Sequence, residues 1–489
     1  MLKLVRWLPV CGVLLTSGAV QARGEAGWFD DPAFQRRLDR QTHSRAFRGN
    51  EVKLLVNGVN SYRQRQRNVA EADVVLLKTY NFREDATGRQ MVSWLEDRLA
   101  RGKQVFVQFD VKGSTKSPFK LFGIKRGRTS PIPATLQRLV DRGAVVIPTN
   151  APGRLRDCNP VFGKDHEKYL ITWRRGGPVT VVMGGMNVGD EWARGGDRSA
   201  RVPALHGAHG FRDTDVQVLG PVTRAIVQEF LADALHHGGR YREAHSTRRK
   251  AAPKVKALAS RLGTGLAELR QAVAQLDREA SSSYAKRAAD ANCRFVANRP
   301  LRGVPGQYIE NLFSLMLERA PGVTLSNAFF LPTKRLLTSL EGAAARGAPT
   351  RMLLNGTDAV EHGFRLVAKR ARKDYRYLLQ SRKAGDRLKI FEWHGDPSKG
   401  VSSIHQKVWA FGDGAWDPFG VGSSNLDFHS LRRNSEGVLL IQDPKTKRAL
   451  DRALREDFAA PGVERVRSDQ LPGRLKLWFQ SLFPPRSWL

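Results

Sequence analysis

The tripeptide His-x-Lys occurs twice in this 489-residue chain, as His166-Glu167-Lys168 and as His405-Gln406-Lys407. Each copy is followed by the pattern Gly-x-x-Asn, which ends at Asn187 in the first half of the chain and at Asn425 in the second. The spacing between histidine and asparagine is nearly equal in the two copies. Such a repeated pair of motifs predicts that the chain is built from two copies of one unit.

Local spacing indicates how each tripeptide could form a site. Side chains two residues apart lie on the same face of a β-strand, so histidine and lysine should point into one cleft while the residue between them points away. Apolar residues follow each lysine and predict such a strand. Gly-x-x-Asn follows a second apolar run, 179–183 or 419–421, and a glycine turn there can bring amide and backbone N–H groups close to an anion. Two imidazoles and two ammonium groups together indicate phosphate chemistry.

The repeat extends beyond these motifs. Phe82 and Phe330 each follow an apolar run, and the separation between matching features changes slowly and in order along the chain. Apolar strands alternate with helical segments such as 91–99 and 333–344. This alternation is typical of α/β layers, so we predict two α/β domains.

A different composition separates the two copies. Residues 245–293 are basic, rich in alanine and poor in strand-forming residues, and a helical stripe of leucine and valine begins after Thr264. We interpret this segment as a helical linker packed on the outside of the protein, with a docking helix for a partner as the alternative. The linker leaves domains at residues 23–244 and 294–489, each of ordinary domain size.

Several longer segments resemble the phospholipase D superfamily, whose signature is His-x-Lys, four residues, Asp, then Gly-Ser/Gly-x-Asn. MGGMNVGDEW (183–192), FRDTDVQVLGPV (211–222) and GSSNLDFHSLRRNSEGVLL (422–439) look most like its cardiolipin synthase branch. One departure is that Trp173 and Gly412 stand where the signature Asp should be. In the family this Asp is not thought to contact phosphorus, so the departure bears on local geometry more than on catalysis.

The resemblance implies an α/β fold of two tandem phospholipase D-like domains, each a mixed sheet flanked by helices. The domains would form a pseudo-twofold pair with one shared active site. The residues that would hold the non-bridging phosphate oxygens are Lys168, Lys407, Asn187 and Asn425. We expect no cofactor and no metal, because two ammonium groups supply positive charge and the chain has no obvious cluster with metal-ligand spacing.

The resemblance also implies the catalytic pair. His166 and His405 would act in turn, one attacking phosphorus to give a phosphohistidine and the other protonating the departing alkoxide. In two-domain relatives the first-half residue is often assigned as the nucleophile, which favours His166. Glu436 and Asp213 match carboxylates that orient a histidine in the family, with an ordinary surface acid as the alternative for either.

The N-terminus has the features of an export signal. Two basic residues precede an apolar run, 7–20, that ends in Val20-Gln21-Ala22, and this run is shorter than the roughly 20 residues that a membrane span requires. We expect residues 1–22 to be a cleaved signal peptide of an exported, periplasmic bacterial protein, with an uncleaved anchor as the alternative. An exported compartment permits a disulfide between Cys158 and Cys293, and two buried thiols fit equally well.

Charge narrows the class of partner. Lysine and arginine number 81 against 47 for aspartate and glutamate, which gives a net charge of +34. Such a charge attracts anionic membrane surfaces and nucleic acid alike, unless it reflects only solvated basic faces. The basic and aromatic segment 474–489 can lie in a lipid interface, although covering a core is the more common role of such a segment.

The main hypothesis is a phosphatidyltransferase of the cardiolipin synthase type, which joins the phosphatidyl group of one phospholipid to the hydroxyl of another, such as phosphatidylglycerol. A hydrolytic phospholipase D differs only in using water as the acceptor. A periplasmic nuclease fits the charge, but the segments above resemble the lipid branch, so nucleic acid is not the expected substrate. Two complete sets of His, Lys and Asn disfavour a non-catalytic lipid-binding adaptor. We expect an anionic phospholipid substrate, peripheral membrane contact and a functional monomer.

Overall fold

The computed structural model describes most of the chain, in the ranges 27–114, 132–151, 163–246, 253–279, 284–304, 306–360 and 365–473. The N-terminal segment 1–22, Cys158 and the C-terminal segment 474–489 lie outside these ranges, so the predictions made for them stay predictions. Within the described ranges no helix combines the length and the apolar character that a bilayer crossing requires. Cys293 is a buried free thiol, and burial raises its pKa.

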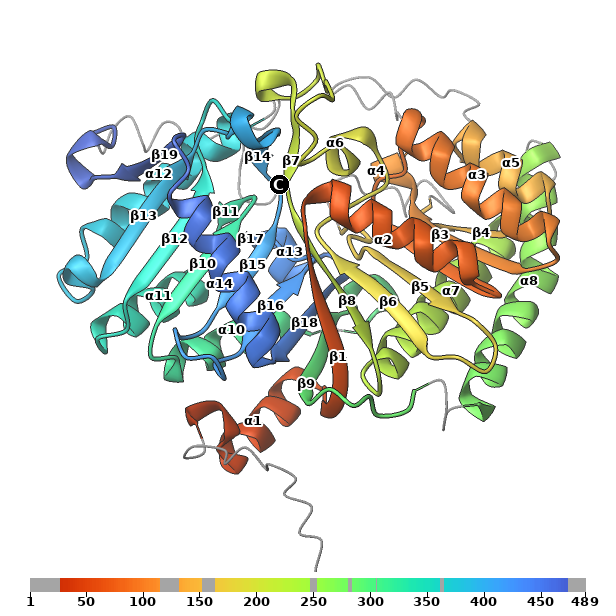
Figure 1. Ribbon diagram of the computed structural model, residues 1–489, viewed down its shortest axis with the longest axis horizontal. Helices are drawn as coiled ribbons and strands as arrows, with labels where there is room; N and C mark the ends of the chain where they lie inside the picture. Colours follow the sequence, from red (N-terminus) through yellow and green to blue (C-terminus); the bar gives the residue numbers. More distant parts are fainter. Residues whose placement is uncertain are drawn as a thin grey trace, which may run out of the picture.

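Fifteen of the nineteen strands in the described part of the protein form one mixed sheet, with β1 and β9 adjacent near its middle (Figure 1). The other four strands, β7, β11, β14 and β17, form two separate two-stranded sheets. The strands of the first half are β1 (Ala46–Val56), β2 (Val74–Thr79), β3 (Gln104–Asp110), β4 (Val145–Thr149), β5 (Tyr169–Trp173), β6 (Val179–Gly184), β7 (Gly210–Arg212) and β8 (Thr214–Leu219). The strands of the second half are β9 (Ala291–Asn298), β10 (Val323–Asn327), β11 (Phe330–Leu331), β12 (Thr350–Asn355), β13 (Leu388–Trp393), β14 (Val401–Ile404), β15 (Lys407–Ala410), β16 (Phe419–Gly422), β17 (Leu426–Asp427), β18 (Glu436–Gln442) and β19 (Val463–Val466).

The two halves of this sheet have the same strand order. Outward from β1 the order is β8, β6, β5, β2, β3 and β4, and outward from β9 it is β18, β16, β15, β10, β12 and β13, followed by β19. In each half the first pairings are antiparallel and the strands from β2 or β10 outward to β4 or β13 are parallel. The predicted mixed α/β sheet is confirmed, and the shared order is what two copies of one unit would give. The domain boundaries themselves stay a prediction.

Helices pack on this sheet (Figure 1). Their bounds are α1 (Pro32–Thr42), α2 (Asn57–Glu71), α3 (Ala86–Ala100), α4 (Val111–Ser114), α5 (Ala134–Asp141), α6 (Asp190–Ala193), α7 (Thr223–Ser246), α8 (Pro253–Arg278), α10 (Tyr308–Arg319), α11 (Lys334–Ala345), α12 (Arg365–Leu379), α13 (Phe428–Arg432) and α14 (Pro444–Phe458). Side-chain caps fix several starting points, because Asp85, Thr333 and Asp443 each accept a hydrogen bond from a backbone N–H in the first turn. The helix predicted at 91–99 lies within α3, and the one predicted at 333–344 matches α11 except that Thr333 is the N-cap.

The predicted linker helix exists but begins earlier than expected. Helix α8 starts at Pro253 rather than after Thr264, because proline at the first position of a helix loses no hydrogen bond and already has a helical φ angle. Its predicted stripe is buried: Leu266, Leu269, Val273 and Leu276. The helix packs against α7 and β4, so it covers the outer edge of the first half of the sheet.

The ends of the parallel strands position the site. All six residues of β2 are buried, as are the last six of β3, because both faces of these strands are covered. Tyr80 and Asn81 follow β2, Lys112 follows β3, and Phe329 follows β10 in the other half. Carboxyl ends of parallel strands meet at one edge of a sheet, so these loops converge on a single cavity.

Candidate active site

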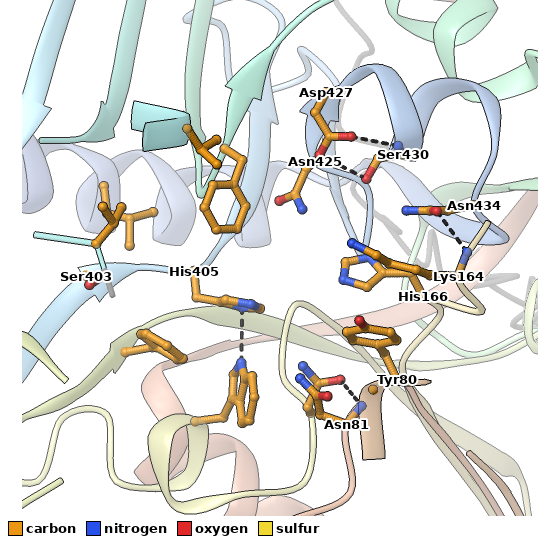
Figure 2. Close-up of a pocket in the computed structure, with 18 of the residues that line it drawn as sticks. Tyr80, Asn81, Lys164, His166, Ser403, His405, Asn425, Asp427, Ser430 and Asn434 are labelled. Carbon is orange, nitrogen blue, oxygen red and sulfur yellow. Dashed lines mark hydrogen bonds between the residues drawn. The ribbon is translucent and has the colours of Figure 1, made fainter. Parts of the chain in front are cut away.

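Both histidines of the repeated motif line one cavity of about 270 Å³ between the two halves (Figure 2). Asn187 and Asn425, from the two Gly-x-x-Asn turns, line the same cavity. The four residues are far apart in the sequence and come from equivalent places in the two halves of the sheet. The structure therefore places the two motifs in one shared site.

The histidines lie just before their strands and not within them, which corrects the expected strand. Strand β5 begins at Tyr169 and β15 at Lys407. The cause is a change of hydrogen-bond partner: the backbone N–H of His166 donates to the carbonyl of Ser435 (2.8 Å), and that of His405 donates to the carbonyl of Arg212 (2.8 Å). Each histidine is thereby attached through its backbone to the opposite half of the chain.

The two supporting carboxylates are exchanged between the halves. Nδ1 of His166 lies 2.8 Å from Oε1 and 3.0 Å from Oε2 of Glu436, which belongs to the second half. Nδ1 of His405 lies 2.7 Å from Oδ2 of Asp213, which belongs to the first half. Both carboxylates are fully buried. This contact holds each ring so that its other nitrogen, Nε2, is free to face the cavity.

The two rings have different neighbours. The ring of His405 stacks on Phe211, with centroids 5.0 Å apart, and Trp192 contacts it edge-on at 5.4 Å. The indole N–H of Trp192 lies 3.1 Å from Nδ1 of His405. The ring of His166 instead meets the edge of Tyr80 at 4.9 Å. One histidine is therefore enclosed by apolar rings and the other by a phenol.

The two lysines of the motif are buried beside the histidines. Burial and the neighbouring lysine hold the pKa of Lys168 at about 7, although Glu436 acts in the opposite direction. Burial likewise lowers the pKa of Lys407 to about 8 against the opposing effect of Asp213. Each ammonium donates to the backbone carbonyl of its own histidine. An arriving phosphate anion would favour the charged form of both.

The asparagines present amide groups next to the histidines. Oδ1 of Asn187 accepts a hydrogen bond from the backbone N–H of Asn81 (2.9 Å), while its Nδ2 is buried without a hydrogen-bond partner in the protein. The side chain of Asn425 likewise has a buried oxygen without a partner, and this amide lines the cavity. A buried amide N–H₂ without a partner is costly, so Nδ2 of Asn187 is suited to donate to an anionic oxygen.

Electrostatics differs between the two carboxylate–histidine pairs. Burial raises the pKa of Glu436 to about 8. Burial would also raise the pKa of Asp213, but the adjacent His405 and Lys407 outweigh it and hold the pKa below its usual value. Burial and the nearby lysines lower the pKa of both histidines, to about 4 for His405, so both imidazoles are neutral at pH 7 in the empty site.

Sequence reasoning missed several residues of the site. Tyr80, Lys164 and Asn434 line the cavity on the His166 side, and Ser423 donates a 2.5 Å hydrogen bond to Oε2 of Glu436. A signal was present for two of them, because Lys164 precedes the histidine by two residues and Ser423 lies within Gly-x-x-Asn. Tyr80 follows β2 and Asn434 lies between α13 and β18, and only the fold reveals which residues are next to them.

Behind the first motif lies a buried cluster of charges. The carboxylates of Asp165, Glu167 and Asp233 converge within 4.8 Å of one another, a separation that could hold a metal ion. The ammonium of Lys78 lies among them, 3.0 Å from Asp165 and in contact with the other two. The lysine takes the place that a cation would take, and Glu167 points away from the cavity as its position in the motif predicts.

The two positions that depart from the family signature are structural. Trp173 is buried at the end of β5, where its backbone accepts from Asp73. Gly412 has a φ of 119°, and a Cβ there would lie 2.1 Å from the carboxylate of Asp417. The second half therefore has an acid near this turn, contributed by a residue five positions later.

Fold and site together resemble those of the phospholipase D superfamily. A family model described as "Cardiolipin synthase, PLD-like domain" matches residues 322–458. Cardiolipin synthase A of Pseudomonas aeruginosa is 24% identical over 425 residues, which cover 86% of this chain and 70% of that protein. Cardiolipin synthase A of Pseudomonas putida (strain GB-1) is 24% identical over 418 residues, 84% of this chain and 68% of that protein.

A solved structure has a similar fold. The crystal structure of phosphatidylserine synthase from Haemophilus influenzae Rd KW20 matches with a TM-score of 0.58 at 11% identity, covering 92% of this chain and 97% of that one. At this identity the match shows the fold alone. The family model and the cardiolipin synthase A relatives support a cardiolipin synthase-like protein of the phospholipase D superfamily and indicate an enzyme of that superfamily.

Proposed function

We propose that the protein is a phosphatidyltransferase of the cardiolipin synthase type, which transfers the phosphatidyl group of one phospholipid to a hydroxyl of another. The observation that carries this proposal is the pair of histidines, each on a buried carboxylate, that face one cavity. Similarity to cardiolipin synthases over 86% of the chain supports a phospholipid as the substrate.

The proposed reaction has two steps. Nε2 of one histidine attacks phosphorus, the bond to the leaving alcohol breaks, and the second histidine gives a proton to the departing oxygen. The second histidine then removes the proton of the acceptor hydroxyl, whose oxygen attacks phosphorus and releases the first histidine. Water as the acceptor would give hydrolysis by the same route.

Charge stabilisation comes from the groups around the rings. A bound phosphodiester raises the pKa of Lys168 and Lys407 above their values of about 7 and 8 in the empty site, so both are ammonium groups when substrate is present. These cations and the amide of Asn187 would hold the non-bridging oxygens as negative charge builds up in the transition state. Because they are fixed by the fold, they need no reorganisation during the reaction.

One experiment tests this function. The protein is incubated with phosphatidylglycerol vesicles, with and without added glycerol, and separately with plasmid DNA, all in EDTA. Cardiolipin and free glycerol are the expected products. Phosphatidic acid as the sole lipid product would establish a hydrolase, and nicked plasmid without lipid turnover would overturn the proposal in favour of a nuclease.

Histidine variants connect the product to the site. His166→Ala and His405→Ala are each expected to lower turnover at least about 10³-fold, because each removes a group that acts directly on the reacting atoms. His236→Ala is the matched control, since His236 lies on α7 outside the cavity. Normal turnover in either site variant would remove the basis of the proposal.

We also propose that the protein is exported to the periplasm and contacts the membrane peripherally. The support is in the sequence: the apolar run of residues 7–20 and a net charge of +34. Fractionation of cells expressing the full chain, with the mass of the mature N-terminus, tests both. A cytoplasmic protein that retains residues 1–22 would contradict the export proposal.

A further inference from the structure

The cavity has two chemically different sides, although it is built from two halves with the same strand order. The side around His405 is mostly apolar, with Phe211, Trp192, Phe329 and Ile404, and its cation is Arg83, which lies 5.9 Å from the centre of the Trp192 ring and pairs with Glu191. The residues on the opposite side, around His166, are polar or charged: Tyr80, Lys112, Lys164, Asp427, Ser430 and Asn434. Figure 2 shows Lys164 and Asn434 beside His166, while Ser403 lies beyond His405.

Equivalent positions in the two halves show how this difference arises. Phe82 bridges to Val188 in the first half as Phe330 pairs with Leu426 in the second, so the loops after β2 and β10 correspond. Asn81 in the first loop therefore matches Phe329 in the second. By the same logic Lys164 and Ser403 match, since each precedes its histidine by two residues.

Lys164 is built into the site and is not a freely moving surface lysine. Its backbone N–H donates to Oδ1 of Asn434 (2.9 Å), and its carbonyl accepts from the N–H of Ser435 (2.9 Å). Its ammonium lies 6.0 Å from the centre of the Tyr80 ring. The carboxylate of Asp427 lines the same cavity and is the N-cap of α13, where it accepts from the N–H of Ser430 (2.8 Å).

Lys112 adds a second cation on this side. It follows β3, its ammonium donates to the carbonyl of Gly163 (3.2 Å), and it lines the same cavity as Lys164. The two lysines outnumber the one carboxylate that lines this side, that of Asp427, and together with a phenol and an amide they are suited to bind an anionic phosphate. The apolar side around His405 is suited to the acyl-bearing part of a lipid.

The geometry of substitution at phosphorus connects these sides to the two histidines. The entering and the leaving group lie roughly in line at phosphorus, so the alcohol that leaves and the alcohol that replaces it occupy the side opposite the attacking nitrogen. His166 therefore acts as acid and base toward an alcohol on its own side of the cavity. The nitrogen that attacks phosphorus from the opposite side belongs to His405.

We propose that the acceptor alcohol enters on the His166 side of the cavity with an anionic phosphate bound by Lys164, and that His405 forms the bond to phosphorus. The proposal rests on the transferase function above and specifies its acceptor as a phosphate-bearing alcohol. It reverses the nucleophile that the family resemblance favoured.

Nε2 of His405 donates its electron pair to phosphorus, the P–O bond to the first alcohol breaks, and that oxygen takes the proton from Nε2 of His166. The acceptor hydroxyl then returns a proton to Nε2 of His166 and its oxygen bonds to phosphorus. The P–N bond breaks and its electron pair returns to His405.

The states of the two carboxylates fit these roles. Nδ1 of His405 lies 2.7 Å from Asp213, 3.1 Å from the indole nitrogen of Trp192 and 3.1 Å from Nζ of Lys407. Because the pKa of Asp213 is held low, we assign the ring proton to Nδ1, which leaves the lone pair of that ring on Nε2. Glu436, whose pKa is about 8, carries a proton near neutral pH and can donate it to Nδ1 of His166. The neutral ring of His166 then carries its own proton on Nε2, the nitrogen that protonates the departing oxygen.

The first test uses a short-chain phosphatidyl-p-nitrophenol as donor, with glycerol 3-phosphate or glycerol as acceptor. For the native protein we expect KM for glycerol 3-phosphate to be at least about tenfold below that for glycerol. Lys164→Ser, which installs the residue of the other half, should bring the two KM values within about twofold of each other. Lys445→Ser, on the exposed start of α14, is the matched control and should retain the preference.

Failures of the two proposals are distinguishable. The phosphate subsite alone is overturned if Lys164→Ser keeps the preference for glycerol 3-phosphate. It is also overturned if the native protein transfers to glycerol but shows no such preference. Absence of any transfer product from the native protein overturns the transferase function, and this inference with it.

The second test separates the histidines. p-Nitrophenolate leaves without a proton, so a variant lacking the acid still completes the first step. We expect His166→Ala to give a burst of about one p-nitrophenolate per protein and a phosphatidyl adduct on His405 by mass spectrometry. His405→Ala should give neither. A burst and adduct in His405→Ala, or no burst in His166→Ala, would refute the assignment.

Discussion

Gly185→Ala is predicted to inactivate the protein through Asp213. A Cβ at residue 185 would lie 2.3 Å from Oδ1 and 2.8 Å from Oδ2 of Asp213, although the backbone there does not require glycine. Ordinary contact begins at 3.4 Å, so the carboxylate must move by roughly 1 Å. That shift would lengthen its 2.7 Å contact with Nδ1 of His405 beyond a good hydrogen bond.

The expected effect is a fall in kcat of about 10²-fold, which corresponds to about 2.7 kcal/mol in activation free energy. The assay is steady-state cardiolipin formation from phosphatidylglycerol vesicles, with the unfolding temperature measured in parallel. Gly239→Ala is the matched control, because nothing lies within 4 Å of a Cβ at that position on α7.

A double-mutant cycle makes the test specific. If Gly185→Ala acts through Asp213, it should add little to the loss already caused by Asp213→Asn, since the two changes remove the same support. Activity within about threefold of the native value in Gly185→Ala, or additive losses in the double variant, would refute this reasoning.

Three further predictions follow from the same contacts. Ser423→Ala removes the hydroxyl that donates to Glu436 and should lower kcat about tenfold; unchanged kcat would show that this hydrogen bond is dispensable. The pKa values of Lys168 and Lys407, about 7 and 8, predict that kcat/KM falls as pH rises through 7 to 8, because the ammonium forms bind phosphate; a pH profile that rises over this range would contradict it. Lys78→Met leaves three buried carboxylates without their cation and should lower the free energy of unfolding by about 3–5 kcal/mol in urea titrations, whereas a loss under 1 kcal/mol would show that the cluster is neutral.

The strands and their motifs could be predicted from the sequence because their signals are local. Alternating and continuous apolar runs gave the strands after each His-x-Lys and before each Gly-x-x-Asn, and the structure has β5, β6, β15 and β16 there. The exact start of each strand could not be predicted. It depends on hydrogen bonds from His166 to Ser435 and from His405 to Arg212, which join residues far apart in the chain.

The pairing of carboxylates also required the fold. Sequence spacing within each half pointed to Glu436 and Asp213 but not to which histidine each would hold. Glu436 holds the histidine of the first half and Asp213 that of the second, because the segments 164–166 and 434–436 lie side by side and β7 pairs with β14. Such an exchange leaves no trace in local spacing.

The pattern of likeness and difference between the halves has a chemical reason. The groups that meet phosphorus and its oxygens are repeated, since a two-step substitution needs a similar nitrogen, cation and amide on each side. The groups that meet the two substituents differ, as Lys164 against Ser403 and Asn81 against Phe329 illustrate. A phosphodiester with one lipid end and one polar end is itself unsymmetrical, so a site of two matched halves must diverge where it binds those ends. The tests of Lys164 and of the two histidines measure whether this divergence fixes the direction in which the reaction runs.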